Sequence, residues 1–283
     1  MKNNMIHLKE INIQTNDILH PLVDIYRDCR NMIKENSDNS EVYLSIASKS
    51  VQTMLGICNT IVILLNNEND RQNDIPCILG YTLAANSIIA TYFLNHSNTL
   101  DSLQYKNRYF SQEMFNRSYS VDSLEDAKIK EFAVKAILRV ENIDPSYYSP
   151  ERDLFTRYDL KLLVDYNIKH FKDEYNNADN NNNYEMKETM LLALNISRLM
   201  KMILLNGEGR VNARPSTLFF LSKKHDENRE LLKHCLLLSA NVLYWLLCHY
   251  KIRKMIADKI IDKSISVVEN IINKIASQIE FPS

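Results

Sequence analysis

The chain has 283 residues, of which 45% are hydrophobic and 24% are charged, and this ordinary globular balance excludes wholesale disorder. It contains only 4 Gly and 6 Pro, well below the average usage of about 7% and 5%. Because sheet proteins need these residues at their many tight turns, the composition predicts an all-α fold. The net charge of −1 excludes binding to nucleic acid or anionic lipid through overall charge.

The cysteines and the apolar stretches predict a cytoplasmic protein without membrane insertion. The five cysteines are odd in number and form no CxxC pair, which is typical of free thiols in a reducing compartment. Residues 1–7 lack the apolar run of a signal peptide. The longest strongly apolar stretch, 235–247, carries Ser239 and Asn241 and is shorter than a bilayer-spanning helix. An effector secreted without a cleavable signal would share these features.

Three helices are predicted in the first third of the chain. The first covers 16–34, where apolar residues recur every three or four positions and Pro21 fits the first turn. Ser40 is a suitable N-cap for the second helix, 40–65. The third helix covers 74–94, after a polar loop. Gly80 lies in this helix near Ala84 and Ala85, which predicts close packing against another helix.

The middle of the chain predicts helices separated by polar segments. The Tyr- and Phe-rich segment 103–119 and the amphipathic segment 124–140 are expected to be helical. A further helical region covers 150–171. The Asn-rich tract 176–183 has almost no core-forming residue, so it predicts an exposed loop. That loop is either an insertion in a single domain, residues 1–283, or a domain boundary.

The last hundred residues predict three more helices. The first, 185–205, has Gly207 in position for a C-cap. The next, 226–249, is apolar on most of its faces, as in a helix that others surround. The last covers 255–279. No repeat of 30 to 45 residues recurs, so the sequence predicts an irregular all-α bundle of about eight to ten helices.

The sequence contains none of the motifs that carry metal or nucleophile chemistry. It lacks HExxH, paired ExxH segments and an aspartate-rich run, so no metal site and no cofactor are predicted. The nucleophile-elbow pattern GxSxG is also absent. These absences favour a binding protein over an enzyme.

Two segments are candidate surfaces for binding another protein. The loop 206–215 holds half of the glycines together with Arg210 and Arg214. Tyr147 and Tyr148 are adjacent aromatic residues of the kind that anchors protein interfaces. The alternative interpretation is a flexible connector in the loop and ordinary packing for the tyrosines.

One short motif suggests a different function. Arg229 and His234 form an Arg-x4-His pattern that resembles the motif of the HEPN-superfamily ribonucleases, which are all-helical and place this pair near a dimer interface. The resemblance implies that Arg229 holds the scissile phosphate and His234 assists proton transfer, roles that suit both side chains. The alternative interpretation places both residues on the exposed first turns of a core helix.

Two functions are therefore predicted. The first is a non-enzymatic helical module that binds another protein, in the manner of an immunity or antitoxin-type inhibitor or an adaptor. The second is a metal-independent ribonuclease that uses Arg229 and His234. A nucleic-acid partner is less favoured, because the basic cluster at 251–263 is interleaved with apolar residues at helical spacing, which indicates a solvated helix face.

Overall fold

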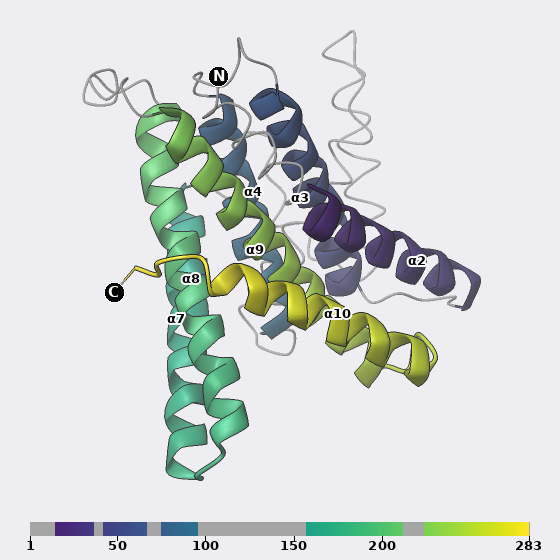
Figure 1. The fold of residues 1–283 in the computed structure, drawn as a ribbon. Helices are drawn as coiled ribbons and strands as arrows, with labels where there is room; N and C mark the ends of the chain where they lie inside the picture. Colours follow the sequence, from purple (N-terminus) through teal and green to yellow (C-terminus); the bar gives the residue numbers. More distant parts are fainter. Residues whose placement is uncertain (1–14, 37–41, 67–74, 96–156, 212–223, 283) are drawn as a thin grey trace, which may run out of the picture. The chain divides into compact units, whose positions relative to one another are not determined.

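The computed structural model describes residues 15–36, 42–66, 75–95, 157–211 and 224–282, and every regular element within them is helical. The predicted all-α fold is confirmed. The described residues contain seven α-helices, so the predicted count of eight to ten is not confirmed. The elements, labelled in Figure 1, are a π-helical turn η1 (Thr15–Leu19), α2 (His20–Asn36), α3 (Val42–Asn66), α4 (Ile75–Asn95), α7 (Arg157–Asn180), α8 (Tyr184–Val211), α9 (Lys224–Ile252) and α10 (Asp258–Ala276).

The chain divides into two compact units. One comprises residues 1–94 together with 163–283, and the other comprises 95–162. Nearly all of the second unit lies outside the described residues, and so do the helices predicted at 103–119 and 124–140. The core described below therefore belongs to the first unit.

Helix α9 is the centre of this core, as its apolar sequence predicts. It packs against α3, α10, α8 and α2, and every residue from 235 to 243 is buried. Two of these residues are polar. Ser239 donates to the carbonyl of Cys235 at 2.8 Å, and its Oγ lies 3.5 Å from Cys58 Sγ of α3. These bonds satisfy the hydroxyl group, so its burial does not leave an unpaired polar atom.

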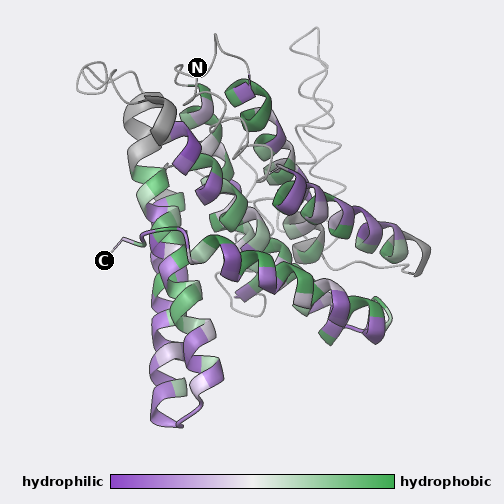
Figure 2. Ribbon diagram, viewed as in Figure 1, coloured by the Kyte–Doolittle hydropathy of each residue, from purple (hydrophilic) through white to green (hydrophobic). Residues whose placement is uncertain are grey.

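Helix α10 covers α9 with a single apolar stripe. Its buried residues recur at helical spacing, and Figure 2 shows hydrophobic and hydrophilic residues alternating along it. The chain turns between the two helices at Lys254, whose φ is 54°. There the amide of Met255 donates to the carbonyl of Tyr250 at 3.0 Å, a bond typical of a left-handed helix end.

Helices α7 and α8 form a hairpin with a short turn (Figure 1). The loop predicted over 176–183 is wrong for most of its length, because α7 continues to Asn180. The amides of residues 181–183 all donate to carbonyls of the last turns of α7. Asn183 then caps α8, since its Oδ1 accepts from the amide of Met186 at 3.2 Å.

The end of α8 also differs from the prediction. The helix continues through Gly207 and Gly209 to Val211, so Gly207 is not a C-cap. Glycine within a helix costs only about 1 kcal/mol relative to alanine, so it does not by itself end the helix. The predicted loop at 206–215 is therefore helical as far as residue 211.

The prediction of a cytoplasmic protein is wrong. Three helical segments are long and apolar enough to cross a membrane by length and composition: 47–66, 75–95 and 228–252. The sequence interpretation considered only the stretch 235–247, whereas the helix that contains it extends beyond both ends of that stretch. The expectation that the protein does not insert into a membrane rested on the same short stretch, so it is no longer supported.

Candidate functional site

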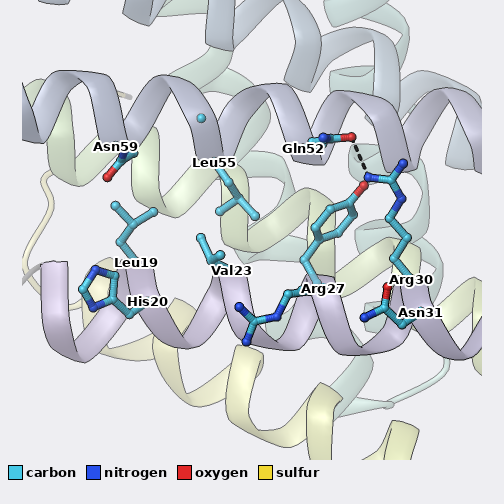
Figure 3. A pocket seen from close by; sticks show the side chains of 11 residues that line it. Leu19, His20, Val23, Arg27, Arg30, Asn31, Gln52, Leu55 and Asn59 are labelled. Carbon is cyan, nitrogen blue, oxygen red and sulfur yellow. Dashed lines mark hydrogen bonds between the residues drawn. The ribbon is translucent and has the colours of Figure 1, made fainter.

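A groove of about 500 Å³ lies between α2 and α3. Ligand pockets commonly have volumes of about 300–1,000 Å³, so the groove is large enough to receive side chains of another molecule. Figure 3 shows Leu19, Val23 and Leu55 pointing into the space between the two helices. The lining residues are Leu19, His20, Val23, Tyr26, Arg27, Arg30, Asn31, Gln52, Leu55, Gly56 and Asn59.

Two hydrogen bonds between α2 and α3 hold the helices at the width of the groove. Tyr26 Oη donates to the carbonyl of Ser48 at 2.9 Å, and the Tyr26 side chain is buried. Arg30 Nη1 donates to Gln52 Oε1 at 2.8 Å (Figure 3). Both bonds join residues 22 positions apart, so they fix one helix against the other rather than stabilising a single helix.

The floor of the groove is apolar and open at one glycine. Leu19 and Leu55 are 1% and 4% exposed, and Val23 lies beside them (Figure 3). A Cβ atom placed on Gly56 would meet nothing within 4 Å. The space next to Gly56 is therefore open, and Gly56 is one of the residues that line the groove.

The rim of the groove is polar and carries positive charge. Arg27 is paired with Asp24 at 2.7 Å and lies 3.8 Å from Asp28, so its charge is locally balanced. Arg30 instead donates to the neutral amide of Gln52. A guanidinium has five donors in a planar fork, so Arg30 can bind a carboxylate while it keeps this bond.

The predicted catalytic pair lies near the start of α9. Five positions on a straight helix correspond to a rotation of about 140°, so Arg229 and His234 point away from the axis in different directions. Both side chains are half-buried, whereas the alternative interpretation expected them to be exposed. Their catalytic role stays a prediction.

The side chains of the other predicted site residues lie outside the part of the chain that the structure describes. Arg210 lies in the last turn of α8, and its side chain is outside the described set. Arg214, Tyr147 and Tyr148 lie outside the described residues altogether. Binding of a partner at these four residues stays a prediction.

No candidate metal centre is found in the part of the chain that the structure describes, because no three His, Cys, Asp or Glu side chains come together there. The five cysteines, all of which the structure describes, form no disulfide bond. Burial raises the pKa of Cys29, against the smaller opposing effect of its hydrogen bond to Ser264. This thiol therefore stays protonated and weakly nucleophilic.

Sequence reasoning missed the groove. The groove is lined by η1, α2 and α3, and no pattern within one of these elements predicts that they meet. The available signal was Gly56, an isolated glycine within a helical pattern. Such a glycine commonly has a packing or functional reason. Comparisons of the chain with protein-family models, with curated proteins and with solved structures find no match.

Proposed function

We propose that this chain is a non-enzymatic helical module that binds another protein, as an inhibitor or an adaptor, and that the groove between α2 and α3 receives part of that partner. The observation that carries the proposal is the open space above Gly56 between an apolar floor and a polar rim. Protein interfaces combine these features, with apolar anchors at the centre and hydrogen bonds around them.

The dimensions of the groove favour a peptide segment as its occupant. An amphipathic helix or a short extended segment is commonly recognised through two or three side chains that enter a groove between helices. The exposed amides of Asn31, Gln52 and Asn59 can donate and accept hydrogen bonds along the rim.

The charge of the rim favours an acidic segment. Arg30 bonds to a neutral amide, and a carboxylate from the partner would add an opposite charge and accept from the remaining donors of the guanidinium. We therefore expect a partner segment with apolar residues beside an Asp or Glu. The ribonuclease alternative gains no support from the half-buried, divergent Arg229 and His234.

Paired substitutions at Gly56 test the proposal. Gly56→Leu adds a large side chain to the lining of the groove, whereas Gly56→Ala adds one methyl group that meets nothing within 4 Å. Alanine should also stabilise α3 by about 0.5–1 kcal/mol, since glycine is unfavourable within helices. Gly56→Ala is thus a matched control that keeps the groove open.

The measurement is quantitative co-purification of the tagged full chain from its native host, from the soluble fraction and from detergent-solubilised membranes in parallel. We expect one stoichiometric protein with the wild type and with Gly56→Ala, and its loss with Gly56→Leu. A partner retained equally by all three proteins would show that the groove does not bind it.

A further inference from the structure

Helix α4 differs in composition from every other described helix. Its 21 residues, Ile75–Asn95, include no Asp, Glu, Lys or Arg. At a rise of about 1.5 Å per residue the helix is about 31 Å long, which matches the hydrocarbon thickness of a bilayer, about 30 Å. Length and composition together therefore suit a lipid environment.

The outward face of α4 is a mostly apolar stripe. Ile75 and Ile78 are 47% and 41% exposed, Thr82 is exposed and Ile89 is half-buried. The spacing of three, four and seven residues places these side chains on one face of the helix. We call these four residues the α4 stripe. Large apolar side chains on the surface of a helix without any charge indicate a surface that does not face water.

The polar side chains on or next to the α4 stripe are bonded within the helix itself. Thr82 Oγ1 donates to the carbonyl of Ile78 at 3.2 Å, and Asn86 Nδ2 donates to the carbonyl of Thr82 at 2.9 Å. In hydrocarbon an unsatisfied donor costs several kcal/mol. Bonds back to the helix backbone reduce that cost and need no water.

The opposite face of α4 is fixed against the protein. A Cβ atom on Gly80 would lie 2.9 Å from Leu231 Cδ1 of α9, so the close approach predicted from the small residues near Gly80 is confirmed. Ala84, Ser87 and Thr91 are fully buried on this face. The rotation of α4 about its axis is therefore determined, and the α4 stripe faces outward.

The other two candidate spans present different surfaces. The exposed residues of α3 are mostly polar and include Lys49, Gln52 and Asn59 beside one exposed isoleucine, Ile63, and placing this charge and these amides in lipid would be costly. Of the apolar segments, 67% of that in α9, 56% of that in α4 and 44% of that in α3 is buried inside the protein, so burial distinguishes α9 and the polar surface distinguishes α3. Among the described helices, α4 has the outward surface that fits lipid.

We propose that the α4 stripe is embedded among the acyl chains of a lipid bilayer and is the surface by which this protein contacts the membrane. The inference is independent of the groove, because the groove is lined by η1, α2 and α3 alone. The α4 stripe could instead contact a second copy of the chain or another protein, and the experiment distinguishes these cases from lipid.

The test is flotation of the purified full chain with phosphatidylcholine vesicles, for the wild type and two lysine variants. Ile78→Lys places a charge in the α4 stripe, and Thr60→Lys places one on the exposed polar face of α3. We expect the wild type to float, Ile78→Lys to lower the vesicle-bound fraction about tenfold or more, and Thr60→Lys to stay within about twofold, because a lysine within a membrane helix is strongly unfavourable. Helix content by circular dichroism must be equal in all three.

A second measurement keeps the proposal testable if Ile78→Lys does not fold. Ile78→Trp and Thr60→Trp are each made in a Trp245→Phe background, and acyl-brominated lipid should quench only the first. Wild-type protein that stays unbound, or equal loss of binding in both lysine variants, overturns the proposal. A dimer that Ile78→Lys converts to a monomer, without vesicle binding, assigns the α4 stripe to a second copy instead.

Discussion

Helix α9 and the end of the α7–α8 hairpin both consist of α-helix, but different interactions stabilise them. In α9 every residue from 235 to 243 is buried, and four other helices surround it. Between residues 173 and 188, around the turn, Ala178 is the buried residue, and Figure 2 shows hydrophilic residues gathered there. The turn is held by the Asn183 cap and by exposed ion pairs such as Lys187–Asp179 at 2.5 Å.

The difference shows where the stability of this unit lies. Burial of apolar surface contributes about 25 cal/mol per Å², whereas an exposed ion pair contributes about 0–1 kcal/mol. The contacts of α9 with α3 and α10 therefore hold the unit together. The hairpin turn should open locally without unfolding the rest.

The largest effect is expected in α9. Leu243 is fully buried, so Leu243→Ala leaves a cavity and should lower the free energy of unfolding by about 2–5 kcal/mol. Urea denaturation measures this change. The control is Leu191→Ala on α8, where the side chain is 41% exposed and the loss should be much smaller. Equal losses at the two sites would show that α9 is not the centre of stability.

A smaller, local effect is expected at the hairpin turn. Asn183→Ala removes the acceptor for the amide of Met186 and should cost about 1 kcal/mol. Hydrogen exchange should become faster at residues 173–188 while the exchange of α9 amides changes little. Asn183→Asp, which keeps a capping oxygen, should restore slow exchange. Faster exchange throughout α9 would contradict the separation of the two regions.

The pH dependence of stability should contain a contribution from α7. Burial lowers the pKa of His170 below 6.5, although Glu174 and Asp173 oppose the shift. The folded protein then holds fewer protons at this site than the unfolded chain does, so the contribution is complete above about pH 6.5 and is lost as the pH falls below it. The urea midpoint should fall more between pH 7 and pH 5 in the wild type than in His170→Gln. Identical profiles would exclude this site as the cause.

The smallest effect is expected at an exposed ion pair between α7 and α8. Lys201 Nζ lies 2.6 Å from Asp165 Oδ1, and both side chains are substantially exposed. Lys201→Met should change the free energy of unfolding by less than about 1 kcal/mol, and added salt should reduce the difference further. A loss as large as that of Leu243→Ala would refute the comparison with α9.

The candidate site was less predictable than the fold. The packing role of Gly80 was predictable from its small neighbours, because the close approach of two helices needs small residues at the point of contact. The groove depends on Tyr26 and Arg30 reaching Ser48 and Gln52, and no local pattern encodes those pairings. The cytoplasmic prediction failed because the helix around 235–247 is longer than its most apolar part.

The sequence by itself determined the helical class, since four glycines and six prolines in 283 residues leave few tight turns. It also determined the central position of α9, because a helix that is apolar on most faces must be surrounded. The structure decided how far α7 and α8 extend, since α7 continues to Asn180 although the composition of the Asn-rich tract disfavours a helix. It also decided which faces of α3 and α4 point outward. Both helices are apolar, and contacts such as Cys58 with Ser239, 181 positions away, depend on which helices meet and not on the pattern within either one.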